Sequence, residues 1–149
     1  MDNVELRKID ADNYSECLDL QVNDDQRNFV ASNVYSLAQA WVHYENAYPF
    51  AIYAGDVMVG FVMMGYDSEK NRYIIWRFMI DKRYQNKGYG KAALALSIKH
   101  LAEKYNVNEI FLSFEPANHI AERLYDSFGF MKTGEVDHGE LVMRLAINR

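Results

Sequence analysis

Two glycines and two lysines lie close together in the middle of the chain, in a segment whose residue types suit anion binding. The segment comprises Gln85, Asn86, Lys87, Gly88, Tyr89, Gly90 and Lys91. Glycine lets a chain turn sharply and lets backbone amides approach a ligand without a Cβ atom in the way. The apolar periodicity that follows predicts a helix, whose first free N–H groups and dipole favour an anion. This combination predicts a pyrophosphate site; the plain alternative is a tight turn with two surface lysines.

Residues 88–93 also match the Gly-x-Gly-x-x-Ala fingerprint of dinucleotide-binding proteins, and Glu109 follows roughly 20 residues later. The sequence context argues against that alternative. The fingerprint belongs directly after a strand of a parallel sheet, whereas residues 81–87 intervene here and the preceding strands are predicted to be antiparallel. Glu109 also stands at the start of a predicted strand, whereas the acid that binds ribose belongs at a strand end.

The elements around this segment predict an α/β fold, with a mixed α+β sheet in a single domain spanning residues 1–149. Apolar runs separated by turn residues predict antiparallel N-terminal strands at residues 50–54, 57–64 and 73–80. The strand at residues 109–114 follows a long helix, which predicts one parallel βαβ crossover. A short helix near residues 118–127 and a C-terminal hairpin complete the fold.

A first strand near Val4 and two helices are predicted ahead of the meander. The second helix is expected to end before Pro49, because the residue preceding a proline disfavours helical geometry. Its residues Leu37 and Trp41 are assigned to the core, as is Phe61 in the following sheet.

Composition narrows the class of protein further. The net charge of −5 argues against nucleic-acid binding, and the four histidines and single cysteine show no metal-ligand spacing. The lone Cys17 excludes an internal disulfide, and neither a signal peptide nor a membrane span is evident, so a cytoplasmic location is expected. Residues 1–70 hold four Lys/Arg against twelve Asp/Glu, whereas residues 71–149 hold twelve against nine. An acidic and a mildly basic half suit a cationic ligand and an anionic one, respectively.

Two blocks of the chain resemble the GCN5-related N-acetyltransferase (GNAT) family. Residues 85–90 resemble its Q/R-x-x-G-x-G/A motif, which binds the pyrophosphate of acetyl-CoA, and residues 118–130 resemble its N-x-x-A-x-x-L-Y-x-x-x-G-F block. The blocks come in the family's order, and the resemblance covers residues 50–147. Within the family, the run Arg77-Phe78-x-Ile80-Asp81 and the ending Gly134-Glu135-x-Asp137 are similar to the spermine and spermidine acetyltransferases.

The resemblance implies acetyl-CoA as co-substrate, with its pantetheine arm between two splayed parallel strands. The arm would pair with the strand edge at Phe78, Met79 and Ile80, and the backbone of residues 85–91 would hold the pyrophosphate. Asn118 would bind the pantetheine arm, and its place at a helix start also suits an N-cap.

Tyr125 matches the family tyrosine beside the thioester sulfur, which implies that it protonates the departing CoA thiolate; packing on a helix face is the alternative. Related polyamine enzymes place an acidic residue on the strand before the motif, but residues 74–77 (Ile-Ile-Trp-Arg) contain no carboxylate. Glu115 is therefore the first candidate for the general base and Asp81 the second. Glu115 also suits an exposed position before Pro116.

The acceptor is expected to bind at the acidic first half, where Asp24, Asp25 and Glu45 lie in or near the first two helices. Tyr44 and Tyr48 could line the channel with rings that face cationic amines; for each of these five residues, ordinary surface or core placement is the favoured alternative. The predicted function is acetyl-CoA-dependent N-acetylation of a primary amine, most simply a polyamine, with no nucleic-acid or membrane partner. Another small amine, an amino acid, a protein amine and a non-catalytic CoA-binding module remain alternatives, and the family also implies a homodimer.

Overall fold

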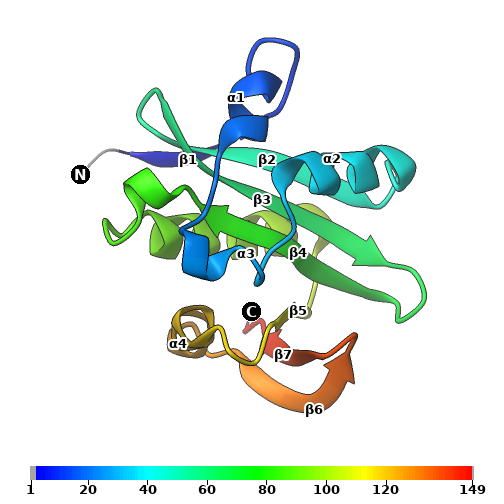
Figure 1. Cartoon of the computed structure of the whole chain (residues 1–149). Coiled ribbons are helices and arrows are strands. Elements are labelled where there is room, and N and C mark those ends of the chain that lie inside the picture. The colour runs from blue at the N-terminus through cyan, green and yellow to red at the C-terminus, as the bar shows by residue number, and fades with distance from the viewer. Residues whose placement is uncertain (1–2, 149) are drawn as a thin grey trace.

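A seven-stranded mixed sheet with helices on both faces forms the framework of the computed structural model, which describes residues 3–148 (Figure 1). The strand order is β1-β2-β3-β4-β5-β7-β6. The strands are β1 (Val4–Lys8), β2 (Ala47–Ala54), β3 (Val57–Asp67), β4 (Arg72–Ile80), β5 (Glu109–Phe114), β6 (Met131–Asp137) and β7 (Glu140–Ala146). The helices are α1 (Tyr14–Asp19), α2 (Asn33–Val42), α3 (Tyr89–Tyr105) and α4 (His119–Ser127), with short 3₁₀ turns η1 (Asp24–Gln26) and η2 (Lys82–Tyr84).

Alternating side chains of the central strand β3 supply both cores of the molecule. Val62 and Met64 belong to the core that also includes buried residues of α3 and α4, whereas Phe61 and Met63 belong to the core beneath α1 and α2. This period of two is expected for a strand that is buried on both faces. The apolar run in the sequence is therefore typical of a central strand. Helices cover β3 on both faces of the sheet.

The predicted meander, the parallel crossover and the C-terminal hairpin are confirmed. Pro49 lies inside β2 rather than ahead of it, at a position beyond the end of β1, whose last partner is Phe50. A proline without an N–H group is tolerated there because no β1 carbonyl lies opposite.

The core assignment was right for Phe61, which is fully buried, and wrong for Trp41, which is 80% exposed. Helix α2 buries Asn33, Ser36 and Ala40, which lie on one face at helical spacing. Trp41 directly follows Ala40 and therefore points away from that face. Leu37 is half-buried against the core beneath α1 and α2.

Strands β4 and β5 part after a short stretch of pairing, and the cause lies at Trp76. Met63 pairs with Arg77 and Met64 with Ile75, so Trp76 is an extra residue in β4. Such a bulge bends a strand and increases its twist. Within the described residues, β4 pairs with β5 only at Ile74↔Phe111 and Ile75↔Leu112. The outer edge of β4 is therefore unpaired beyond the bulge, as the family resemblance implies.

Candidate active site

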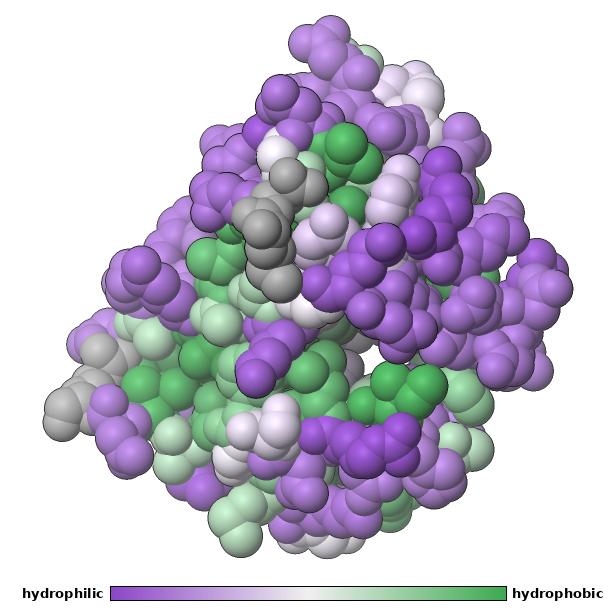
Figure 2. Space-filling view, turned by 90° about the vertical axis from the view of Figure 1, so that its left-hand side faces the viewer, coloured by the Kyte–Doolittle hydropathy of each residue, from purple (hydrophilic) through white to green (hydrophobic). Residues whose placement is uncertain are grey.

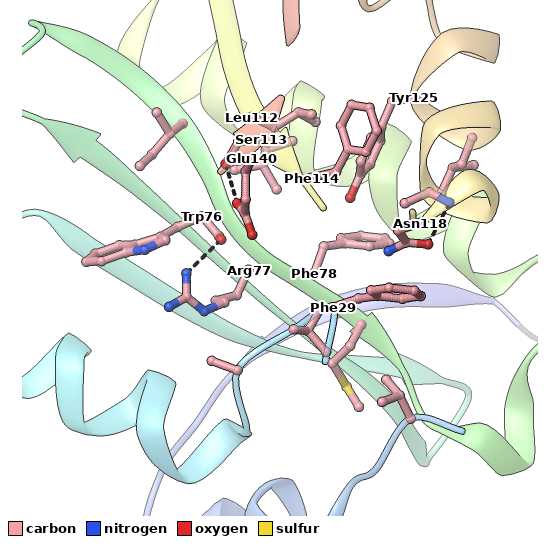
Figure 3. A pocket seen from close by; sticks show the side chains of 18 of the residues that line it. Phe29, Trp76, Arg77, Phe78, Leu112, Ser113, Phe114, Asn118, Tyr125 and Glu140 are labelled. Carbon is pink, nitrogen blue, oxygen red and sulfur yellow. Dashed lines mark hydrogen bonds between the residues drawn. The ribbon is translucent and has the colours of Figure 1, made fainter. Parts of the chain in front are cut away.

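A large cleft opens where β4 and β5 diverge. Its walls come from the far halves of both strands, from the segments at residues 22–31 and 84–90, from α4 and from the hairpin between β6 and β7. Aromatic side chains border much of it, including Phe29, Trp76, Phe78 and Phe114 (Figure 3). In the space-filling view, apolar surface borders a hollow between the upper and lower parts of the molecule (Figure 2). The cleft thus combines aromatic side chains with many polar and charged ones, and a concave site of this kind suits a ligand that has both apolar and polar parts.

The loop before α3 forms one mouth of this cleft. Asn86 and Gly88 adopt left-handed backbone geometry, with φ of 63° and 84°, and Gly88 is the N-cap residue of α3. No side chain of the described residues caps the first turn, so its backbone N–H groups remain available to a ligand. This is the geometry in which a helix start binds phosphate.

The predicted anion-binding residues divide into two groups. Gln85, Asn86, Tyr89 and Gly90 line the cleft. Lys87, Gly88 and Lys91 lie beside its mouth on the exposed surface and are absent from its lining. The structure therefore puts the backbone of the loop next to the cleft and the two lysine charges at its rim.

The Gln85 side chain is occupied by contacts within the protein. Its amide nitrogen donates to the Ile80 carbonyl and to Gln26 Oε1, each at 2.9 Å, and its oxygen accepts from Asn23 Nδ2 at 3.0 Å. These bonds join the end of β4 to η1 and to the loop before α3. Gln85 thus shapes the mouth of the cleft, and its backbone is the part left for a ligand.

Phe78, Met79 and Ile80 all line the cleft along the unpaired edge of β4. Met79 points into the core beneath α1 and α2, whereas Phe78 and Ile80 pack against the core on the opposite face. The side chains therefore alternate across the strand, and the edge between them presents backbone groups. An extended ligand that carries amides can pair with such an edge as an added strand would.

Helix α4 begins and ends beside the cleft. Asn118 is its N-cap, accepting a hydrogen bond from the Ala121 amide at 3.3 Å, and it also lines the cleft. Tyr125 is 7% exposed, with its ring packed edge-on against Phe114 and Phe130 at centroid distances of 6.3 and 6.0 Å. Its hydroxyl points into the cleft (Figure 3). Asn118 and Tyr125, the two residues of the block at 118–130 that were expected to contact acetyl-CoA, therefore both border the cleft.

Burial raises the pKa of the Tyr125 phenol above its ordinary value of 10.0, and the negative charge of Glu140 raises it further. Desolvation and a nearby anion both disfavour the phenolate. The hydroxyl is consequently protonated at neutral pH, which is the state required of a proton donor.

The carboxylates predicted as general bases do not meet the cleft. Neither Glu115 nor Asp81 is among its lining residues. Asp81 is 2% exposed and accepts hydrogen bonds from the Gln21 amide at 2.9 Å and from Arg83 Nε at 2.8 Å. Burial works to raise the pKa of Asp81, but these bonds outweigh it and the pKa lies below its usual value. Asp81 therefore serves as a structural anchor at the N-terminus of η2.

The acceptor residues predicted in the first two helices are dispersed. Asp25 lines the cleft, whereas Asp24 lies outside its lining and pairs with Arg27 at 3.2 Å. Glu45 is exposed and also lies outside the lining.

The two tyrosines expected in the acceptor channel are not there. Tyr44 is 70% exposed, and Tyr48 stacks on Tyr105 of α3 at 5.1 Å. Tyr48 packs against the core that α3 covers, so its ring lies on that face of the sheet and not in the cleft. The aromatic residues that do border the cleft include Trp76 and Phe78 of β4, Phe114 of β5 and Phe29 in the segment after η1.

Two polar side chains that were not predicted as site residues, Glu140 and Arg77, face the cleft from opposite walls. Glu140 starts β7 and accepts a hydrogen bond from Ser113 Oγ at 2.7 Å. Arg77 on β4 donates to Gln39 Oε1 at 2.9 Å and to the Trp76 carbonyl at 3.1 Å. A polar Ser113 inside an otherwise apolar strand is the sequence signal that could have drawn attention to this wall.

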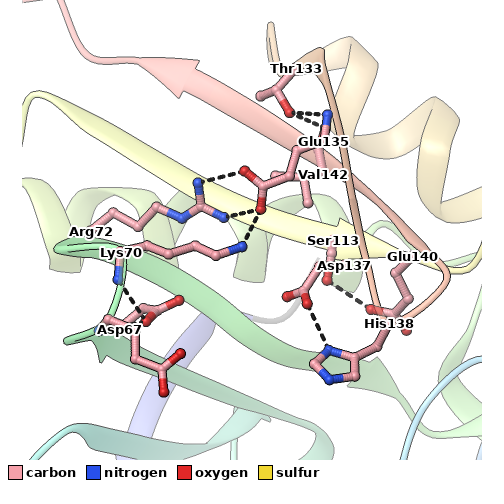
Figure 4. A network of polar contacts seen from close by, with 11 residues as sticks. Asp67, Lys70, Arg72, Ser113, Thr133, Glu135, Asp137, His138, Glu140 and Val142 are labelled. Carbon is pink, nitrogen blue, oxygen red and sulfur yellow. Dashed lines mark hydrogen bonds and ion pairs between the residues drawn. The ribbon is translucent and has the colours of Figure 1, made fainter.

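A network of ion pairs fastens the opposite end of the β4–β5 seam (Figure 4). Arg72 of β4 donates to both oxygens of Glu135 on β6, at 3.1 and 2.9 Å, and Lys70 joins the same carboxylate. The Arg72 guanidinium also lies over the Phe111 ring at 4.3 Å. Hydrogen bonds from Arg72 and Lys70 lower the pKa of Glu135 to about 2. The network therefore holds the seam closed where the cleft ends.

Among residues 3–148, no three His, Cys, Asp or Glu side chains converge as a possible metal site. No helix in the same range has the length and apolar character needed to cross a membrane.

Comparison with known proteins agrees with this geometry. Residues 6–130 match the family model described as "Acetyltransferase (GNAT) family". A spermine/spermidine N(1)-acetyltransferase of Bacillus subtilis (strain 168) is 39% identical over 149 residues, covering 95% of this chain and 97% of the relative. A probable spermine N(1)-acetyltransferase of Bacillus subtilis subsp. natto shows the same identity and coverage.

Two solved structures share the fold. Spermidine N-acetyltransferase from Vibrio cholerae, in complex with CoA and spermine, superposes with a TM-score of 0.75 at 17% identity, covering 97% of this chain and 94% of that one. The PaiA N-acetyltransferase from Thermoplasma acidophilum, in complex with coenzyme A, gives 0.72 at 15% identity, covering 97% and 99%.

The chain belongs to the GNAT family of acetyltransferases. It is accordingly an N-acetyltransferase that uses acetyl-CoA as the acetyl donor. The cleft fits this co-substrate: the free helix start, the unpaired edge of β4 and the buried phenol follow one another along it. Acetyl-CoA supplies the activated acyl group, and the protein supplies the groups that position it.

Proposed function

We propose that this protein acetylates a primary amine of a polyamine such as spermidine or spermine. The observation that carries the proposal is the 39% identity, over nearly the whole of both chains, with a relative named for that activity. The charge of the cleft supports it independently, because its lining includes five carboxylates: Asp25, Asp67, Glu69, Asp137 and Glu140.

The arginines in the same lining offset only part of this negative charge. The charge of Arg72 is paired with Glu135, whereas Arg77 is held by the neutral groups of Gln39 and the Trp76 carbonyl and keeps its charge, so the five carboxylates outnumber one unpaired guanidinium. A cationic chain that enters the cleft therefore meets more unpaired carboxylates than free cations. Such a field attracts polycations and loses strength as salt is added.

The acceptor site we propose differs from the one expected from the sequence. Four of the five carboxylates lie in the turns of the β3–β4 and β6–β7 hairpins or next to them, and Asp25 is the contribution from η1. The two hairpins lie on the side of the cleft away from the loop before α3. An acceptor that approaches past these hairpins would meet acetyl-CoA beside Tyr125.

Within this proposal, Tyr125 is the general acid. When the carbon–sulfur bond of the thioester breaks, the bonding electrons pass to sulfur, and the phenol donates its proton to that atom. Its buried position and raised pKa keep the proton on the phenol at neutral pH, so the proton is available to the sulfur atom as the carbon–sulfur bond breaks. The residues at 85–91, the β4 edge and Asn118 would position the co-substrate, as the family resemblance implies.

The direct test is an acceptor panel with detection of the released thiol. It should contain spermine, spermidine, a monoamine, an aminoglycoside, an amino acid and a lysine peptide, each with acetyl-CoA. We expect the polyamines to give the highest kcat/KM, and added salt should lower it by raising KM. Unmodified spermine and spermidine beside a rapidly acetylated member of another class would overturn the proposed substrate.

A binding measurement separates failure of the substrate assignment from failure of the site. Acetyl-CoA at saturating concentration should raise the melting temperature, because a ligand that binds the native state alone stabilises it. A polyamine added without acetyl-CoA serves as the comparison for unspecific ionic stabilisation. An unchanged melting temperature with acetyl-CoA would contradict the co-substrate site itself.

A further inference from the structure

On the wall of the cleft that faces β4, one carboxylate, Glu140, is held in place by a hydrogen bond. Glu140 is the first residue of β7 and follows the tight turn at His138 and Gly139, both with positive φ. Ser113 on β5 donates its hydroxyl hydrogen to Glu140 Oε1 at 2.7 Å. Within residues 3–148, no hydrogen bond engages the second oxygen, Oε2. One oxygen is therefore fixed while the other is free for a ligand.

The orientation of Glu140 places it beside the proton donor. Figure 3 shows the carboxylate and the Tyr125 hydroxyl facing the same space above Phe78. The charge of Glu140 acts on Tyr125, since it contributes to the raised pKa of that phenol. An acceptor nitrogen that reaches a thioester next to Tyr125 consequently lies close to Glu140 as well.

N-acetylation needs such a group for a chemical reason. An alkyl ammonium has a pKa near 10.4, so roughly one molecule in 2,500 carries a free lone pair at pH 7. The nitrogen must lose a proton before it can attack a carbonyl carbon. A positioned carboxylate can accept that proton directly or through one water molecule.

Arg77, on the opposite wall of the cleft, also favours the neutral form of an acceptor amine. Burial lowers its pKa, with the negative charge of Glu140 opposing this shift, so the two side chains interact across the cleft. A fixed guanidinium disfavours a second cation close by. An amine between these groups is therefore drawn in by the carboxylate and favoured as the neutral base by the guanidinium.

We propose that Glu140, positioned by Ser113, is the catalytic residue that removes the proton from the acceptor ammonium; this rests on the N-acetyltransferase function proposed above. The N–H bond breaks, its electrons become the nitrogen lone pair, and the proton goes to Glu140 and then to solvent. The lone pair forms the C–N bond, and the C–S bond electrons leave with sulfur. Sulfur takes the proton of Tyr125, and the second proton lost by nitrogen restores the phenol. One proton is released per acetyl group transferred.

The other carboxylates of the protein are less suited to this role. Glu115 lies outside the lining of the cleft, and both oxygens of Asp81 already accept hydrogen bonds. The titratable and charged groups that face Glu140 are Arg77 on β4 and Tyr125 on α4, with Asp137 and His138 in the turn before it. Asp137 and His138 bond to each other at 2.7 Å, whereas Glu140 is the carboxylate whose charge acts on the phenol.

The test is the pH profile of Glu140→Gln, which keeps the size of the side chain and its bond from Ser113. We expect kcat/KM for the amine to fall about 100-fold at pH 7, the usual scale for a lost general base. The deficit should shrink steadily towards pH 10, because the free amine then supplies its own lone pair. Calorimetry should show an unchanged Kd for acetyl-CoA and a weaker Kd for the amine in the complex with CoA.

Two further variants separate proton transfer from loss of charge or fold. Glu103→Gln removes one carboxylate from the exposed surface of α3 and should leave the profile unchanged. Ser113→Ala should reduce kcat about fivefold while KM for acetyl-CoA stays constant, because Glu140 loses its support. Equal melting temperatures for all variants would show that folding is intact.

The proposal is overturned if Glu140→Gln stays within threefold of the wild type at pH 7. A deficit that is equal at every pH would contradict proton transfer, and a larger deficit in Glu115→Gln would return the role to that residue. The experiment does not depend on the polyamine assignment. If the panel identifies another primary amine as the acceptor, the same variants are measured with that amine.

Discussion

The seam between β4 and β5 is closed at one end and open at the other, and the two ends are built from different kinds of residues. At the closed end, Ile75 and Leu112 are each 4% exposed and the strands are in register. At the open end, the strands part after the bulge at Trp76, and aromatic side chains border a cleft. The sheet therefore supplies stability at one end and a ligand site at the other.

This difference shows how a sheet can hold a ligand without losing its core. Arg72 and Glu135 fasten the closed end across three strands, since β4, β5 and β6 all contribute to their network (Figure 4). The free edge of β4 then needs no strand partner, because a ligand with amides can take that place. We expect substitutions at the open end to affect catalysis and those at the closed end to affect stability.

The largest effect should come from the open end, in Tyr125→Phe. Loss of the hydroxyl removes the proton donor, so kcat should fall about 1,000-fold, equivalent to roughly 4 kcal/mol. The ring still packs against Phe114 and Phe130, so the melting temperature and the Kd for acetyl-CoA should stay close to wild type. Steady-state kinetics and calorimetry give both values, with Tyr14→Phe on α1 as the control. An unchanged kcat would remove Tyr125 from the mechanism.

The closed end should respond in stability to Ile75→Ala. Removal of this buried side chain leaves a cavity in the core that α3 and α4 cover and should lower the free energy of unfolding by about 3 kcal/mol. Urea denaturation measures the change. Val136→Ala, on the exposed surface of β6, should cost about 0.5 kcal/mol or less. Equal costs for the two variants would mean that the closed end is not a structural anchor.

The ion-pair network at the closed end should show itself in the pH dependence of stability. The folded pKa of Glu135 is about 2, below its ordinary value of 4.5, so its contribution is complete above pH 4.5. That contribution is lost as the pH falls towards 2. Glu135→Gln should reduce stability at pH 7 by about 1 kcal/mol, the scale of a partly exposed pair. The wild type and the variant should converge near pH 2, and a constant difference at every pH would contradict this origin.

The smallest effect should come from the lysines at the rim of the open end. Lys87→Ala and Lys91→Ala should each weaken acetyl-CoA binding about threefold at low salt, because exposed charges contribute little. High salt should abolish the difference. Lys99→Ala, further along the exposed surface of α3, is the control in the same calorimetric titration. A loss that persists in high salt would indicate a direct, desolvated contact instead.

Local features of this fold were predictable because neighbouring residues determine them. The bounds of β5, the loop before α3 and the N-cap at Asn118 all follow from short patterns of apolar, glycine and capping residues. Hairpin turns and the parallel crossover follow from the spacing of those patterns. The family motifs lie within these segments, which is why the resemblance could be recognised from the sequence.

The features that escaped prediction depend on pairing between distant segments. The antiparallel register of β5 and β7 brings Ser113 and Glu140 together, and no local pattern encodes that register. Likewise, the bulge at Trp76 exists only relative to β3. Trp41 was predicted to be buried because its side chain is large and apolar, and this was wrong. The face of α2 that packs on the sheet is defined by Ser36 and Ala40, and Trp41 lies off that face.

A crystal structure of the protein with bound CoA would locate both ends of the co-substrate. We expect the pyrophosphate on the backbone of residues 85–91, the pantetheine arm along the free edge of β4, and the sulfur within hydrogen-bond reach of the Tyr125 hydroxyl. A pyrophosphate bound elsewhere, or a sulfur remote from that hydroxyl, would contradict this expectation.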